Sequence, residues 1–255
     1  MTSASERTPE PIRVNWKGSR LIGGVAALLA AFVFRRWLSA EFGMLQSFGL
    51  IHFQMQGIPS TPLEWFALLH TNAFVGLLLL NFFDVVNYIL AGLMYLGVYS
   101  LLRNRDKAYI GLAMVLTIVG ISIYIASNQA LNLLSLSNQF FASTSDVERP
   151  LILAAGEYAL VVNDPVVLGT GVFWSYVLFY AAGLMLSIGM VKSDPSGKWK
   201  GVVGMVANAF GLGYFFTAFL GPSLSVIPAV GSALANLVWY IAVGIQLLRS
   251  TQEKA

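Results

Sequence analysis

One acidic residue, Asp84, lies inside a long apolar stretch of this chain. A carboxylate there is a functional candidate, because burying its charge in lipid is costly. Asn81 and Asn87 lie three residues before and after it, a spacing that places all three on one face of a predicted helix. Such a face can bind a proton or a small cation. The alternative is a structural face, on which Asp84 is protonated or hydrogen-bonded to a neighbouring helix and the asparagines hold the helices together.

Two further sets of residues are candidates for the same site. Asn128 and Asn132 follow a predicted span, and with the Asp84 face they are expected to line a cavity on the outer side. Small and amide residues also gather in the last two apolar stretches, at Gly204, Asn208, Gly211 and Asn236. Small residues on one face let helices approach closely, and an asparagine bonds across the contact, so close helix packing is the first interpretation. The alternative is that the two asparagines of this second set line the cavity with Asp84.

The remaining residue types exclude most enzymatic chemistry. The chain has no cysteine and two histidines, so it lacks a thiolate and has too few histidines for a zinc hydrolase. No Gly-x-x-x-x-Gly-Lys-Ser/Thr phosphate-binding sequence occurs. We therefore predict no catalytic residue, no metal and no cofactor. The net charge of +3 is small, so nucleic acid is not an expected partner.

Composition indicates which elements position these residues. Hydrophobic residues make up 57% of the 255-residue chain and charged residues 11%, against about a quarter in soluble proteins. That is too little charge to cover a water-exposed surface, and several apolar runs reach the about 20 residues that a helix needs to cross the hydrocarbon. The sequence predicts an all-α, polytopic transmembrane helical bundle over residues 21–248. A cytoplasmic N-terminal segment (1–20) and a cytoplasmic tail (249–255) flank it.

Six spans are predicted, with seven as the alternative. Five stretches are clear: Leu21–Ser39, Ala108–Ala126, Val166–Val191, Gly201–Leu220 and Ala229–Leu248. The apolar stretch Leu63–Leu102 is long enough for one span or for two. With one span at about Gly76–Leu102, all basic residues except Arg35, Arg36 and Arg149 fall on the cytoplasmic side. Two spans would remove this asymmetry, so the positive-inside rule favours six.

Three further segments are expected on the outer side. Leu63–Val75 is predicted to form an interfacial or re-entrant helix, and Asn128–Phe141 to continue the third span out of the membrane. Ser145 and Glu148 have the spacing of a capping box, and apolar residues recur at helical spacing after them. This pattern predicts an amphipathic helix of about 15 residues on the outer face, too short and too polar to span.

Three stretches of the chain together resemble a known family: Leu96–Arg103, Asp146–Glu157 and Val203–Gly213. The family is an uncharacterised group of prokaryotic multi-span membrane proteins, catalogued only as a domain of unknown function. The resemblance covers about Leu63–Leu248 and implies a bacterial or archaeal protein of the cytoplasmic membrane. It brings no known catalytic residue. It also implies that recognition involves the outer segment Glu148–Glu157.

Three functions are carried forward from the sequence. The first is a non-enzymatic bundle whose outer cavity binds membrane lipid or a small amphiphile, or docks a protein partner or a second copy of the chain. The second is a small proton- or cation-coupled transporter that uses Asp84. The third, an enzyme acting on lipid, lacks a recognisable nucleophile or metal set. In each case we expect a multi-pass protein of the cytoplasmic membrane with both ends in the cytoplasm.

Overall fold

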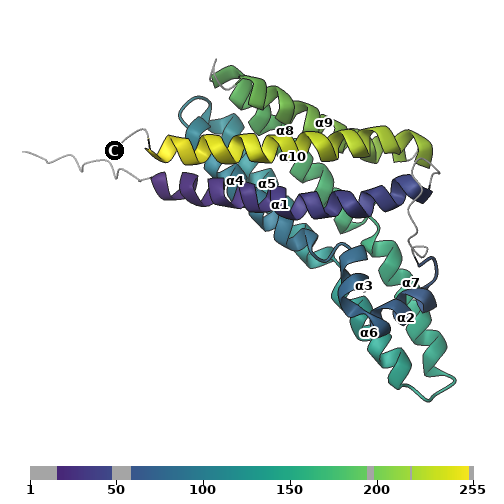
Figure 1. Cartoon of the computed structure of the whole chain (residues 1–255). Coiled ribbons are helices and arrows are strands. Elements are labelled where there is room, and N and C mark those ends of the chain that lie inside the picture. Colours follow the sequence, from purple (N-terminus) through teal and green to yellow (C-terminus); the bar gives the residue numbers. More distant parts are fainter. Residues whose placement is uncertain (1–15, 48–58, 194–197, 219, 253–255) are drawn as a thin grey trace, which may run out of the picture.

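The computed structural model describes residues 16–47, 59–193, 198–218 and 220–252, without the side chains of 33–47, 218 and 222–223. Residues 1–15 of the predicted cytoplasmic N-terminal segment, one of the two histidines (His52), and residues 194–197 lie outside the described residues. Within the described ranges the regular structure is helical and contains no strand (Figure 1). The all-α prediction is confirmed. The helices are α1 (Lys17–Ser47), α2 (Pro62–Thr71), α3 (Ala73–Leu79), α4 (Asp84–Leu102), α5 (Lys107–Ser127), α6 (Ala130–Ala142), α7 (Glu148–Asn163), α8 (Gly171–Ser193), α9 (Lys198–Ala218) and α10 (Pro222–Gln252).

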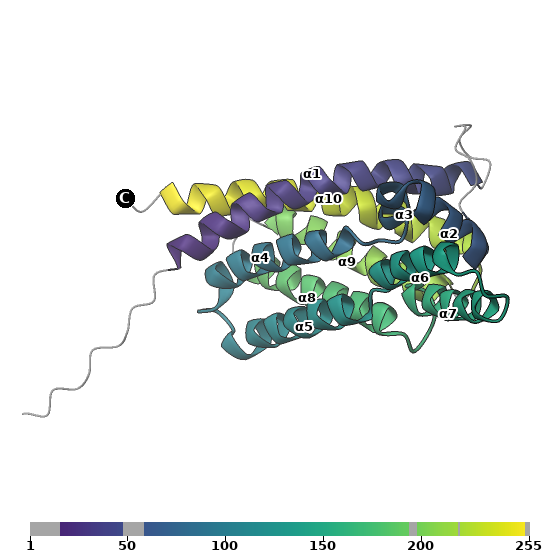
Figure 2. The same cartoon turned by 90° about the horizontal axis from the view of Figure 1, so that it is seen from below.

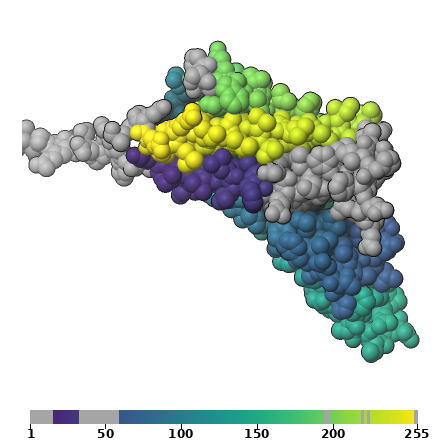
Figure 3. All heavy atoms as spheres, in the orientation of Figure 1, coloured from purple at the N-terminus to yellow at the C-terminus, as the bar shows by residue number. Residues whose placement is uncertain are grey.

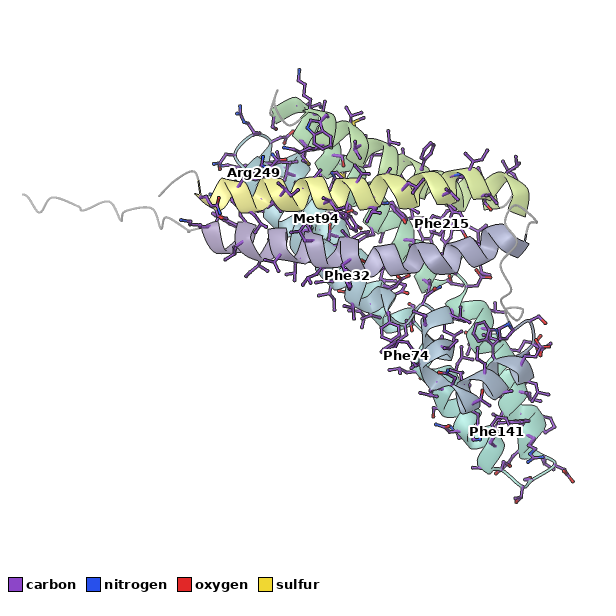
Figure 4. The ribbon with its side chains drawn as sticks, in the orientation of Figure 1. Phe32, Phe74, Met94, Phe141, Phe215 and Arg249 are labelled. Atoms are coloured by element: carbon purple, nitrogen blue, oxygen red, sulfur yellow. The ribbon has the colours of Figure 1, made fainter. Side chains whose placement is uncertain are left out.

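The long helices α1, α4, α5, α8, α9 and α10 form one bundle. Each packs on its neighbours: α1 on α4 and α10, α5 on α8, and α9 on both α8 and α10. Figures 1 and 2 show these helices running side by side along the bundle. The bundle core includes Met94, Tyr95 and Trp239, which are fully buried, and Figure 4 shows Met94 between the helices.

Four helical stretches in the described part of the chain are long and apolar enough to cross a membrane. They are Asp84–Leu102, Lys107–Ala142, Gly171–Ser193 and Leu224–Gln252. The predicted membrane class is therefore supported by helices, not by composition alone. In the ambiguous stretch 63–102 only α4 has this length, because α2 and α3 have 10 and 7 residues.

Glycines bring the bundle helices into close contact. A Cβ on Gly23 of α1 would lie 2.9 Å from the Cα of Gly97 on α4. A Cβ on Gly24 would lie 3.1 Å from the carbonyl oxygen of Gly244 on α10. Helices that pack in lipid approach through such small residues, because dispersion contacts replace the hydrophobic effect there.

The short helices α2, α3, α6 and α7 form a second assembly, called here the small unit. It has its own apolar core, built from Trp65, Phe66, Leu69, Leu80, Ala130, Leu133 and Ala159. In the space-filling view it projects from the bundle as a separate lobe (Figure 3), and Phe74 and Phe141 mark it in Figure 4. The stretch 63–75, predicted as one interfacial or re-entrant helix, thus contains two short helices: α2 packs on α6 and α7, and α3 packs on α6.

Two breaks separate the small unit from the bundle, and both correct the predicted helix bounds. The second long helix begins at Asp84 rather than at Gly76, because the chain turns at 80–83 and Asn81 adopts a φ of 61°. The predicted continuation of the third span is interrupted, because Asn128 is extended, with a ψ of 123°. A new helix, α6, starts at Ala130.

Helix α7 forms where the amphipathic helix is predicted, but its predicted capping box is incomplete. The Ser145 hydroxyl accepts the Glu148 N–H at 3.3 Å, whereas the Glu148 carboxylate accepts a bond from the Ser143 hydroxyl at 2.8 Å instead of from residue 145. A complete capping box, which the sequence analysis missed, begins α2 at Thr61 and Glu64.

Candidate functional site

Asp84 lies at the junction of the bundle and the small unit, in the first turn of α4. Its Oδ2 accepts a hydrogen bond from the Tyr176 hydroxyl of α8 at 2.7 Å. The residue is partly exposed. A hydrogen bond to a carboxylate is stronger than one between neutral groups, so this contact fixes the side chain against α8.

Two buried oxygens beside Asp84 have no hydrogen-bond partner among the described residues. They are the Oδ1 of Asn87 and the hydroxyl oxygen of Tyr88, on side chains 9% and 4% exposed. Asn87 follows Asp84 by three positions and Tyr88 by four, so both share its helix face. Unsatisfied buried polar atoms are uncommon in native proteins and need an explanation, such as a bound ion or water.

Aromatic rings enclose this group. Tyr88 stacks on Tyr124 of α5 and meets Phe179 of α8 in a T-shaped arrangement, with ring centroids 4.6 Å apart in both pairs. Tyr176, the partner of Asp84, lies at 5.7 Å from Tyr124 in a T-shaped arrangement. A carboxylate, amide and hydroxyl oxygens, and aromatic faces together suit a proton or a cation. The sequence analysis missed Tyr88 and Tyr176; the position of Tyr88, four residues after Asp84, was the only signal for either.

Asn81 and Asn128 meet each other, but not as the sequence predicted. The Asn81 carbonyl oxygen, freed by the turn, accepts bonds from the Tyr124 hydroxyl at 2.8 Å and from Asn128 Nδ2 at 3.4 Å. The Oδ1 of Asn128 accepts the N–H of Ala130, the first residue of α6, at 3.1 Å. Asn81 therefore does not share a helix face with Asp84, and these amides stabilise the two helix breaks.

Asn163, the last residue of α7, joins both breaks and was not predicted. Its Nδ2 donates to the Leu80 carbonyl at 3.0 Å, and its Oδ1 accepts the Gln129 N–H at 2.8 Å. The side chain is buried. One amide thus satisfies two backbone groups that the interrupted helices leave without intrahelical partners.

Asn132 does not join the Asp84 group. It lies on the exposed side of α6, where its Nδ2 donates to Gln129 Oε1 at 2.6 Å. In the described ranges, no group of three or more histidine, aspartate and glutamate side chains that could hold a metal ion is found.

The second predicted set lies deep in the bundle. Asn208 of α9 is fully buried; its Oδ1 accepts from the Tyr95 hydroxyl at 3.4 Å and its Nδ2 donates to the Gly204 carbonyl. Gly204 leaves no room for a Cβ against the indole ring of Trp239, and Gly211 none against the ring of Tyr180. On α10, Asn236 is buried and donates to the carbonyl and hydroxyl of Ser232, whose hydroxyl in turn donates to the Ala207 carbonyl of α9. The bonds Tyr95–Asn208 and Ser232–Ala207 join two helices, whereas Asn236 bonds only within α10, so the predicted bond across the contact is made beside Asn236 by Ser232.

No protein-family model, curated protein or solved structure matches this chain. The resemblance to the uncharacterised prokaryotic family therefore stays a prediction. Two features of the chain bear on its function: the Asp84 group and the surface of the small unit.

Proposed function

We propose that this is a six-span protein of the cytoplasmic membrane with both ends in the cytoplasm. What supports this is the gathering of basic side chains at one end of the bundle. The Arg103 guanidinium lies 4.7 Å from the ring centroid of Trp16, and Arg20 bonds to Ser100 there; Arg249 lies at the same end in Figure 4. The small unit lies at the other end and thus on the outer side.

On this orientation, we propose that the protein is a membrane-anchored docking protein without enzymatic activity, and that the small unit is its recognition surface. One observation carries this proposal. The small unit buries its own core and still exposes large apolar side chains on α7, including Leu151 at 66% and Tyr158 at 72%. Exposed apolar side chains gathered on one surface mark binding sites for apolar ligands or partners. Retained lipid or small amphiphile is the other ligand class that this surface suits.

The orientation can be tested cleanly because the chain has no cysteine. Single-cysteine variants at the exposed positions Glu157 and Arg105 would be labelled with a membrane-impermeant maleimide in intact cells. We expect Glu157→Cys to react in intact cells and Arg105→Cys to react only after permeabilisation. Labelling of Arg105→Cys from outside would overturn the proposed arrangement.

The ligand class can be tested by mass spectrometry of gently extracted protein. If the surface of α7 binds lipid or a small amphiphile, the double variant Leu151→Ser, Tyr158→Ser should lose the molecules that remain bound to the wild-type protein. The matched control is Leu131→Ser, which removes an apolar side chain, 53% exposed, from α6 of the same unit. Lipid retained equally by all three proteins would show that lipid does not bind at this surface.

A second function, proton- or cation-coupled transport, is favoured by a separate observation. Asp84 bonds to Tyr176 near the oxygens of Asn87 and Tyr88, which have no hydrogen-bond partner in the described part of the chain. We expect pH-dependent flux into proteoliposomes that Asp84→Asn abolishes. The matched control is Asp106→Asn, which retains an N-cap oxygen for α5 at the basic end. Equal flux by wild type and Asp84→Asn would exclude this function.

A further inference from the structure

The apolar surface of α7 has a regular spacing. Val147, Leu151, Ala154, Tyr158 and Val161 follow one another alternately four and three residues apart. This is the spacing of a seam between two packed helices, and it places the five side chains in one narrow stripe. All five are exposed, Val147 at 74% and Val161 at 49%. We call this surface the α7 stripe.

The fold of the small unit does not use the α7 stripe. The opposite face of α7 is the buried one, with Gly156, Ala159 and Asn163 facing inward. A Cβ on Gly156 would lie 2.5 Å from the ring of Phe66, so α2 and α7 are already in contact on that face. The stripe is therefore available to a second helix without rearrangement of the unit.

Acidic residues flank the α7 stripe. Glu157 directly precedes the stripe residue Tyr158, so the helical period places it on one flank of the stripe. Asp146 and Asp164 lie just beyond the two ends of α7. Asp146 and Glu157 are exposed. The basic residue of α7, Arg149, is held toward α6. Its guanidinium lies 5.6 Å from the centroid of the Phe140 ring, and its Nε donates to the Ser143 carbonyl.

The whole small unit is acidic. Residues 59–83 and 128–170 contain five acidic residues and one arginine, and no lysine. The chain as a whole has a net charge of +3, so this charge is local to the unit. An apolar stripe with acidic flanks attracts a partner of the opposite pattern, apolar with basic flanks.

This charge pattern disfavours the two other occupants. Helices that lie on membrane surfaces carry Lys and Arg beside their apolar face, because anionic lipid attracts them; the α7 stripe has acids there. A second copy packed stripe to stripe with its α7 antiparallel would bring its own acidic flank against this one, and like charges repel. A parallel copy would offer Glu157 no basic partner, because Arg149 of α7 is held toward α6.

We propose that the α7 stripe docks a cationic amphipathic helix of a partner polypeptide. The apolar side chains of that helix pack between Leu151, Tyr158 and their neighbours, and its lysines or arginines face Glu157 and Asp164. This is the helix-in-groove mode of recognition, in which anchors recur three and four residues apart. The proposal rests on the proposed docking function and on the outer position of the small unit.

The test uses the full chain in nanodiscs of zwitterionic lipid, with empty nanodiscs as the blank. The probe is a fluorescent 18-residue helix, about five turns long, made of leucine and lysine with one apolar stripe. Its matched partner has every lysine replaced by glutamate. Fluorescence anisotropy then gives the Kd of each peptide for wild-type protein, for Leu151→Ser with Tyr158→Ser, for Glu157→Lys and for the off-stripe control Leu131→Ser.

We expect the lysine peptide to bind wild type and the Leu131→Ser control equally, and the glutamate peptide to bind neither. The double stripe variant should weaken binding about tenfold or more, because truncated anchor residues dominate such interfaces. Glu157→Lys should also weaken binding of the lysine peptide. The loss should be larger at low salt than at high salt, because salt screens the repulsion between like charges. Equal binding of the two peptides, or an unchanged Kd in the double stripe variant, would overturn the proposal.

Two other outcomes would assign the stripe to a different occupant and also overturn the proposal. Quenching of a Tyr158→Trp variant by brominated lipid, more than of Leu131→Trp, would place the stripe against the membrane. A protein dimer that Tyr158→Ser dissociates would place it against a second copy. Labelling of Glu157→Cys from outside tests the outer position of the small unit without use of the peptide. A failure of the peptide to bind can therefore be distinguished from a wrong orientation of the protein.

Discussion

Replacing Asn163 by alanine should loosen the small unit while leaving the bundle intact. The change removes the bonds to the Leu80 carbonyl and the Gln129 N–H, both at helix breaks. An unsatisfied buried backbone group costs about 1–3 kcal/mol. The bond to Gln129 is only partly buried, so water can replace part of its loss. We therefore expect the free energy of opening of the small unit to fall by about 2–4 kcal/mol.

Hydrogen exchange followed by mass spectrometry measures this loss region by region. A change of 2–4 kcal/mol corresponds to exchange about 30 to 700 times faster, and we expect it in α2, α6 and α7 but not in α8 to α10. The matched control is Asn132→Ala, which removes an exposed amide from α6 and should change exchange by less than about threefold. If Asn163→Ala exchanges like Asn132→Ala, the two hydrogen bonds do not hold the unit and the reasoning is refuted.

Three further substitutions test other contacts. Gly156→Leu should separate α7 from α2, because the leucine side chain would collide with the buried ring of Phe66. The separation should appear as protease cleavage within residues 59–83, and unchanged resistance to the protease would contradict it. Gly23→Leu should separate α1 from α4 and lower the thermal midpoint of the whole protein, since even a Cβ would lie 2.8 Å from an α4 carbonyl oxygen. Thr61→Ala should cost about 1 kcal/mol of stability in α2, measured by exchange of its first turn. Hydrogen bonds from the Ser60 backbone, the Ser60 hydroxyl and the Thr61 backbone lower the pKa of Glu64. The carboxylate therefore stabilises α2 fully above the usual pKa of 4.5, and this stabilisation is lost as the pH falls through the lowered pKa. Hydrogen exchange at the start of α2 should rise on acidification, and an unchanged rate would contradict the cap.

The sequence determined the class of fold and the place of most elements. Long apolar stretches with charge confined between them fixed where α1, α4, α5, α8, α9 and α10 run, because a helix in lipid must satisfy its backbone internally and must carry apolar side chains outward. The amphipathic pattern after Ser145 likewise predicted α7 within a few residues. These properties are local, so a single sequence carries them.

The helix breaks and the contacts across them were decided by tertiary structure. The stretch 76–102 is mostly apolar, and no proline marks the turn at Asn81, whose positive φ is stabilised by Tyr124 and by the end of α7. The partner of Asp84, Tyr176, is 92 residues away along the chain, and spacing along one helix cannot indicate it. Likewise, the pattern of α7 showed that it has an apolar face, but only its packing on Phe66 determined which face is buried and which stripe is left exposed. Periodicity reports a residue's neighbours on its own helix, whereas exposure and pairing depend on which other helices arrive there.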